Sequence, residues 1–235
     1  MVKSVTFNKE VLALIDELTS INSAIKIYKE DNRIFIKSQN PSESIAYILS
    51  TEVSSFDFDG DEIAFYNYSD FYKWVSALNV TEIKQTSDGM LQLGNGRQKG
   101  QYQSSDVDVI RGGRFDIEFE DPDATFNLSS DDIKELIKLR SLVAKDNNNL
   151  KFTFDNRTAA VEIYNDDTAN KVESDIALTS SVEEPFTLRL SDEFLGTIPG
   201  KYSYRVDIKR EGIARLSMNN DFGVDVEIFI AEVEE

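Results

Sequence analysis

Thr187 to Ile230 read TLRLSDEFLGTIPGKYSYRVDIKREGIARLSMNNDFGVDVEIFI. The stretch opens with a short alternating strand, and Ser191 then has a side chain suited to cap a helix start. A brief apolar helix follows and ends at Pro199-Gly200, because proline cannot donate a helical hydrogen bond and glycine tolerates the exit geometry. Alternating strands are then predicted over 202–209, 214–218 and 224–230. The predicted unit is a strand, a helix and a three-strand meander.

The same order of elements recurs three more times outside this stretch. The N-terminal copy has a strand at 2–7, Asn8 as a helix cap, a helix at 9–19 and three alternating runs. Another copy begins near Glu62, with Ser69 or Asp70 as the cap of a short helix. The apolar face of that short helix is predicted to hold Phe71, Trp74, Val75 and Leu78.

The remaining copy begins at Ala124, with Ser129 or Ser130 as the cap of a helix over 131–145. Residues 105–122 interrupt the rhythm with a Gly-Gly pair and an acidic run, which is typical of a connector. Four copies grouped two and two predict an α+β protein of two similar domains. In each domain we expect the helices on one face and the sheets on the other. The predicted limits are a domain at 1–105, a connector at 106–122 and a domain at 123–235.

Composition excludes several classes of function. The 235 residues include 0 Cys and 0 His, which removes disulfides, thiolate metal sites, histidine-based triads and most zinc sites. No window approaches the ~20 apolar residues of a membrane helix, and the N-terminus lacks a signal-peptide pattern. A reducing cytoplasm is compatible with the absence of cysteine. We therefore expect no membrane partner and no catalytic site of these kinds.

The net charge sets a test for any nucleic-acid role. Asp and Glu number 43 against 25 Lys and Arg, giving a formal charge of -18. A uniform surface of this charge would repel nucleic acid. A role on DNA or RNA would therefore need the positive charge to be gathered on one face.

The helix predicted at 131–145 comes closest to meeting that test. At 100° per residue, one side of the helix collects Ile133, Leu136, Ile137, Val143 and Ala144. A narrow sector beside it collects Lys134, Lys138 and Lys145, with Ser141 in the same stripe. Lysines one or two turns apart suit phosphate contacts, although an ordinary solvated face would have the same pattern. Arg140 falls on the apolar side, where we expect its stem to pack and its head to pair with a carboxylate.

The other predicted helices carry fewer candidate cations. Lys73 points away from the apolar face of its helix, as does Lys9, although Asp16 shares the sector of Lys9 and cancels much of its charge. Lys201 follows the last helix and is expected to point the same way. These three lysines complete the candidate DNA-facing set.

Two clusters of acidic residues are candidate metal sites. The first has the sequence DFDGDE and includes Asp57, Asp59, Asp61 and Glu62. Its glycine is misplaced for a calcium loop and no glutamate closes the loop, so a solvated turn is the better interpretation. The second, Glu118, Glu120, Asp121 and Asp123, lies in the connector and is expected to keep it soluble. GNGRQKG is not a phosphate loop, and no carboxylate pair has a context for acid-base catalysis. We predict no cofactor, no metal and no enzymatic activity.

Three stretches resemble a known family. LIDELTSINSAIKI, with its run TSINS at Thr19 to Ser23, resembles the first helix and following strand of the DNA sliding clamp of T-even-like bacteriophages. FYKWVSALNVTEIKQTSDGMLQL is similar to the second helix and meander of that clamp, and IPGKYSYRVDIKREGIARLSM to its final unit. Order and spacing agree over nearly the whole chain, although residue identity is low.

The resemblance implies a homotrimeric ring that encircles duplex DNA and tethers the replicative DNA polymerase. Helices would line the hole, sheets would form the outside, and subunits would join edge strand to edge strand. An ATP-dependent clamp loader would open the ring, and polymerase and loader would dock by C-terminal peptides near the connector. Late transcription machinery is a further partner in these phages, and the location would be the cytoplasm of the infected bacterial host. Lys138 matches the inner helical face most directly, while the near-neutral first helix departs from a strongly basic pore.

Two other functions stay open at this point. One is a β-rich structural or assembly protein of a virus, which would have no DNA-encircling role. The other is a metal-dependent hydrolase that uses the acidic clusters, for which no clustered site emerges from the sequence.

Overall fold

The computed structural model describes residues 2–110, 117, 119–144 and 148–233. The chain forms two compact units. Unit 1 comprises Met1–Asn40, Tyr47–Phe115 and Asp221–Val226, and unit 2 comprises Pro41–Ala46, Asp116–Asn220 and Glu227–Glu235. The domain limits given above stay a prediction, since each unit takes in a short piece from the other half of the chain. The connector predicted at 106–122 lies partly outside the described residues.

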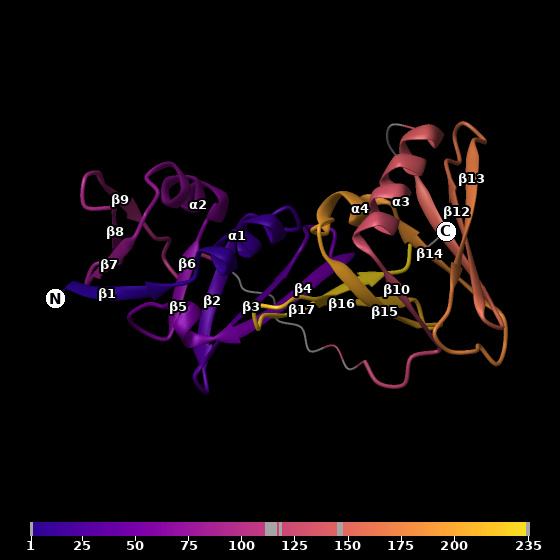
Figure 1. Ribbon diagram of the computed structural model, residues 1–235, viewed down its shortest axis with the longest axis horizontal. Helices are drawn as coiled ribbons and strands as arrows, with labels where there is room; N and C mark the ends of the chain where they lie inside the picture. The colour runs from indigo at the N-terminus through magenta and orange to yellow at the C-terminus, as the bar shows by residue number, and fades with distance from the viewer. Residues whose placement is uncertain (1, 111–116, 118, 145–147, 234–235) are drawn as a thin grey trace. The chain divides into compact units, whose positions relative to one another are not determined.

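The first half of the chain contains two copies of the predicted strand, helix and meander, drawn in indigo to magenta in Figure 1. A one-turn helix and a two-residue strand, neither of which was predicted, separate the copies. The elements are β1 (Val2–Phe7), α1 (Lys9–Leu18), β2 (Ile25–Glu30), β3 (Arg33–Gln39), β4 (Ile45–Glu52), η1 (Val53–Ser55), β5 (Phe56–Asp57), β6 (Glu62–Phe65), α2 (Tyr68–Ala77), β7 (Glu82–Thr86), β8 (Met90–Gly94) and β9 (Lys99–Gln103).

The second half contains the other two copies, and the two helices of each unit lie next to each other in Figure 1. The elements are β10 (Ala124–Leu128), α3 (Ser130–Val143), β11 (Asn149–Asp155), β12 (Thr158–Tyr164), β13 (Lys171–Ala177), β14 (Phe186–Ser191), α4 (Glu193–Thr197), β15 (Ser203–Lys209), β16 (Ile213–Asn219) and β17 (Asp225–Ala231). The fourfold repeat of the α+β unit is confirmed.

The first strand of each copy pairs with the meander of its sister copy. In unit 1, β1 pairs antiparallel with β7, while β6 pairs with β2. In unit 2, β10 pairs with β15, and β14 pairs with β11. β9 is the last strand of the sheet β5-β1-β7-β8-β9, and β13 is the last strand of the sheet β13-β12-β11-β14. This exchange means that neither copy in a unit can complete its sheets alone.

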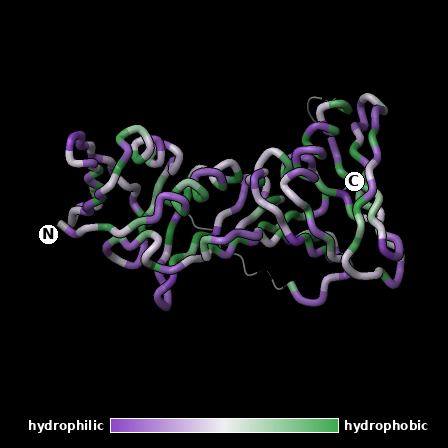
Figure 2. The backbone as a smooth tube through the Cα atoms, in the orientation of Figure 1, coloured by the Kyte–Doolittle hydropathy of each residue, from purple (hydrophilic) through white to green (hydrophobic). Residues whose placement is uncertain are grey.

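Apolar and polar residues alternate along the strands, so one face of each sheet lies in the core. β12 is an example, with Ala159, Val161 and Ile163 buried and the residues between them more exposed. Figure 2 shows the same change between hydrophobic and hydrophilic residues along the strands. An aromatic cluster closes the core of unit 1, where the rings of Phe65 and Phe71 are 4.7 Å apart. Among the described residues, no helix is long and apolar enough to cross a membrane.

A buried carboxylate fixes the outward face of β15 and β16 in unit 2. The side chain of Asp207 is 1% exposed and accepts hydrogen bonds from Arg215 Nη2 at 2.8 Å, Arg205 Nε at 3.0 Å and Thr125 Oγ1 at 2.8 Å. Burial alone would raise the pKa of Asp207, but these three donors outweigh it and the pKa is lowered. The guanidinium of Arg215 also lies 4.6 Å from the ring centre of Phe119, and this contact packs the end of the connector onto the sheet.

Several predicted details are wrong. Ile137 is 39% exposed and Trp74 is 44% exposed, so neither belongs to the buried face predicted for its helix. Helix α3 ends at Val143 instead of reaching 145, because Ala144 is extended. The cap of α2 is Asn67, whose Oδ1 accepts the amide of Asp70. Lys145 and Glu118 lie outside the described residues.

Candidate functional site

Each unit presents its two helices on one side of its sheets, and the candidate lysines lie on their exposed surfaces. We call these surfaces the helical face of unit 1, on α1 and α2, and the helical face of unit 2, on α3 and α4. In unit 1, Thr19 Oγ1 and Ser69 Oγ are 2.8 Å apart, and the Tyr68 hydroxyl donates to the carbonyl of Leu12 at the helix contact. The helices are therefore held to each other as well as to the sheets.

Side-chain caps fix where three of the helices begin. The side chain of Asn8 accepts the amide of Glu10 at the start of α1, as predicted. At α3, Ser129 Oγ accepts the amide of Asp132, and the Asp132 carboxylate accepts the amide of Ser129 in return. This capping box fixes the rotation of the first turn, which sets where the next lysine points.

Unit 2 contains the main group of candidate residues. Lys134, Lys138 and Ser141 are all exposed on the surface of α3 opposite the buried Ile133 and Leu136. Lys134 Nζ lies 2.9 Å from a carboxylate oxygen of Asp131. Lys138 makes no ion pair with any residue in the described part of the chain. The Ser141 hydroxyl donates to the carbonyl of Lys138 at 2.6 Å, so it is used within the helix.

The candidate lysines of unit 1 are exposed, but acidic side chains near them weaken the case for a DNA contact. Lys73 Nζ lies 3.0 Å from Asp70, an ion pair with the same spacing as the pair on α3. Lys9 Nζ donates to Asn79 Oδ1 at 3.1 Å, and its neighbour Glu10 is exposed while Asp16 is half-buried. The helical face of unit 1 therefore carries at least as many acids as bases.

The last candidate, Lys201, lies just beyond α4. Its side chain is exposed and its Nζ is 5.0 Å from the ring centre of Tyr202. The predicted cap of α4 is wrong, because Asp192 is the cap residue although Ser191 Oγ accepts the amide of Glu193. The structure thus places Lys201 on the same unit as Lys134 and Lys138.

Arg140 pairs with a carboxylate, as predicted. Its Nε donates to Asp192 Oδ2 at 2.5 Å, and Asn148 Nδ2 donates to the same oxygen at 3.1 Å. The Asp192 side chain is 7% exposed, so the pair is largely shielded from water. It joins α3 to the start of α4 and holds the helical face of unit 2 in one orientation.

The acidic cluster near β5 is occupied by lysines. Asp57 lies 2.6 Å from Lys29 Nζ, while Glu62 lies 3.2 Å from Lys26 Nζ. Asp59 lies 3.1 Å from Lys3 Nζ, so these three carboxylates of the cluster are paired with three separate lysines. Within the described residues no group of three or more His, Cys, Asp or Glu is placed to hold a metal ion.

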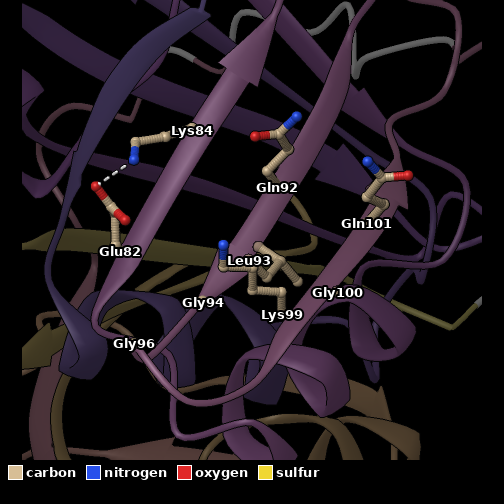
Figure 3. Close-up of a pocket in the computed structure, with 9 residues that line it drawn as sticks. All are labelled: Glu82, Lys84, Gln92, Leu93, Gly94, Gly96, Lys99, Gly100 and Gln101. Atoms are coloured by element: carbon tan, nitrogen blue, oxygen red, sulfur yellow. Dashed lines mark ion pairs between the residues drawn. The ribbon is translucent and has the colours of Figure 1, made fainter.

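A hollow of about 610 Å³ lies on the surface of β7, β8 and β9, which the sequence did not predict (Figure 3). Gly94 lies beside it, and Lys84, Gln92 and Gln101 rise from neighbouring strands. Lys84 pairs with Glu82 at 2.7 Å, the ion pair drawn in Figure 3. The hollow is lined by both polar and apolar atoms, and the edge strand β9 forms part of its wall.

The edge strands β9 and β13 each have exposed apolar residues nearby. Beside β9, the ring of Trp74 lies over Gly100, where an added Cβ would come within 2.8 Å of the indole. On α3, which contacts β13, Leu142 is 67% exposed and Ile137 is 39% exposed. Each unit thus combines an edge strand with exposed apolar surface, which is the composition of a site for another chain.

No family model and no curated protein matches the chain. Solved structures do match it over its whole length. The structure described as the C-terminal region of FEN-1 bound to A. fulgidus PCNA has a TM-score of 0.75 and 15% identity, covering 100% of this chain and 99% of that chain. Proliferating Cellular Nuclear Antigen from Entamoeba histolytica has a TM-score of 0.78 and 13% identity, with 100% of both chains covered. The fold is therefore the PCNA, or DNA clamp, fold that the resemblance implied.

Proposed function

We propose that this chain is a DNA sliding clamp, a homotrimeric ring that encircles duplex DNA and tethers a replicative DNA polymerase without catalysing a reaction. The observation that carries the proposal is full-length agreement with the fold of PCNA from Entamoeba histolytica, at a TM-score of 0.78. A match to one unit alone would not have supported a ring.

The edge strands β9 and β13 support closure of the ring from head to tail. β9 presents Lys99 and the neighbouring Arg97, whereas β13 presents Glu173, Asp175 and Lys171, of which Lys171 and Glu173 are paired at 2.8 Å. An interface between β9 of one subunit and β13 of the next joins unlike edges, and such an interface forms a closed ring when the rotation per subunit fits. It would also cover the exposed apolar residues beside these two edges and protect β9 and β13 from pairing with other chains.

The helical faces support loose contact with DNA. With helices inward, Lys134, Lys138, Lys73, Lys9 and Lys201 would face the duplex, together with Lys145 and Ser141. Contacts of a few lysines with phosphates are independent of sequence and exchange readily, as sliding requires. The net charge of -18 would keep the outer surface away from DNA.

The proposed partners are duplex DNA, DNA polymerase, an ATP-dependent clamp loader and, in late transcription, the transcription machinery. The description of a FEN-1 C-terminal region bound to PCNA supports capture of partners by their C-terminal peptides. We propose an origin in a T-even-like phage, and with it the cytoplasm of the infected bacterial host, on the resemblance in sequence alone.

Two measurements test the proposal. Native mass spectrometry should give a trimer, and the loaded protein should be retained on circular DNA but lost when that DNA is linearised. A virus assembly protein without a ring would bind both DNA forms alike or neither. Monomers at working concentration, or equal retention on both DNA forms, would rule the clamp out.

A paired set of variants tests the lysines. Replacing Lys134 and Lys138 with glutamate should impair loading and processive synthesis while the trimer persists. The control replaces Lys84 on β7 and Lys151 on β11 with glutamate. Each alternates with buried residues along its strand, so its side chain lies on the sheet face opposite the core and the helices. The charge change is the same in both variants. Equal loss of processivity in both would refute the assignment of Lys134 and Lys138.

A further inference from the structure

The same ion pair occurs on the helical face of each unit. On α2, Asp70 lies 3.0 Å from Lys73 Nζ, and on α3, Asp131 lies 2.9 Å from Lys134 Nζ. Both are i,i+3 pairs that start in the first turn of the helix. The four side chains are exposed, with Lys73 at 73% and Lys134 at 65%. Two lysines proposed to meet DNA therefore already have a negatively charged neighbour.

The position of the acids has an ordinary explanation that must be separated from a functional one. Carboxylates in the first turn stabilise a helix through its dipole, and this needs no lysine. Asp132 illustrates that role, since its carboxylate accepts hydrogen bonds from Ser129 and no lysine pairs with it among the described residues. Asp70 and Asp131 differ because each also contacts a lysine on the solvent side of its helix.

An exposed ion pair of this kind is weak, so a phosphate can take the lysine from the carboxylate. While the carboxylate is near, it also repels that phosphate, since like charges a few ångströms apart oppose each other. The lysine therefore exchanges between an internal and an external anion. Lys138, which has no ion pair within the described residues, lacks such competition.

We propose that Asp70 and Asp131 are tuning residues, which compete with DNA phosphates for Lys73 and Lys134 and so keep each contact weak enough for sliding. This inference depends on the proposed clamp function. It assigns a role to two acids that composition alone would place among the residues repelling DNA. It predicts that removing the acids makes the ring bind DNA more tightly and move along it more slowly.

The test compares the trimer with and without the substitutions Asp70→Asn and Asp131→Asn, using a fluorescent linear duplex and a series of NaCl concentrations. Each phosphate newly contacted should steepen the slope of log K against log salt by about 0.9, which is roughly a 3.5-fold larger loss of affinity between 50 and 200 mM salt. On long DNA, the one-dimensional diffusion coefficient of the loaded ring should fall. An unchanged slope would overturn the inference.

Glu135→Gln supplies the matched control. Glu135 lies on the exposed side of α3 and makes no ion pair within the described chain, so its substitution removes one negative charge without releasing a lysine. It should leave the slope within error of the parent. A slope as steep as that of Asp131→Asn would show a general charge effect and overturn the inference.

A variant without the two lysines separates the effect of the ion pairs from any effect of the acids on helix stability. When Lys73 and Lys134 are first replaced by glutamine, Asp70→Asn and Asp131→Asn should no longer change the slope. Persistence of the effect would overturn the proposed competition. If the proposed clamp function were wrong, the result would differ: the parent protein itself would show no preference for circular over linear DNA.

Discussion

Replacing Asp207 with asparagine tests how strongly one buried charge holds unit 2 together. The carboxylate accepts three hydrogen bonds, two of them from arginines. Asparagine keeps one oxygen that can accept a hydrogen bond. Its NH2 group replaces the other oxygen, so a donor would then face the N–H donor of an arginine. Breaking a buried ion pair costs about 3–5 kcal/mol, because it leaves a charge unpaired. Here Arg215 is 22% exposed and Arg205 is 55% exposed, so water can compensate part of the loss and we expect about 2–3 kcal/mol.

Urea unfolding followed by far-UV circular dichroism measures this loss, with Glu227→Gln as the control. Glu227 lies at the rim of the same network, 39% exposed and 3.5 Å from Arg215, so its neutralisation should cost less than about 1 kcal/mol. If Asp207→Asn costs no more than this control, the buried charge does not hold the sheet in the way described.

The pH dependence provides a second check on Asp207. Its pKa is lowered in the folded protein, so its contribution is fully present above the unfolded value and is lost as pH falls through the folded value. The difference in stability between the parent and Asp207→Asn should be constant from pH 7 to about pH 5. It should shrink only below about pH 4, the ordinary range of an aspartate. A difference that shrinks between pH 7 and pH 5 would contradict the lowered pKa.

Three further substitutions have expected effects on stability that thermal unfolding can measure. Gly100→Ala should cost about 1–3 kcal/mol by forcing a methyl group against the indole ring, whereas Gly94→Ala, with its nearest atom 3.6 Å away, should be nearly neutral. Ser129→Ala should cost about 1 kcal/mol by removing the cap of α3, and an unchanged melting temperature would contradict it. Arg140→Met should cost about 2–3 kcal/mol, because among the described residues it leaves the buried carboxylate of Asp192 with only the side-chain amide of Asn148 as a donor. A neutral result would show that this carboxylate finds another partner.

The order of elements could be predicted because each depends on neighbours in sequence. Alternation over 203–209 and a capping residue such as Asn8 are local signals, and both are found in the structure. The pairing of β1 with β7 could not be predicted in the same way, since about 80 residues separate the strands and many pairings satisfy the same alternation. The strand pairings within each unit were not predicted and come from the structure.

The candidate site was predicted in part for a similar reason. A helical wheel placed Lys134 and Lys138 on one side of α3, and the structure places them there. The wheel also assigned Ile137 to the core, which is wrong because only a narrow stripe of α3 contacts the sheets. The ion pairs of Asp70 and Asp131 were missed, although the i,i+3 spacing to a lysine was visible in the sequence.

Trp74 gives the proposed assembly an intrinsic optical signal. It is the one tryptophan in the chain, it is 44% exposed, and it lies over β9 at the edge where we place the neighbouring subunit. Closing that edge would move the indole from water into an apolar contact and shift its emission to shorter wavelength. Opening by a loader would reverse the shift, so the emission of the unlabelled protein would follow each opening and closing in real time.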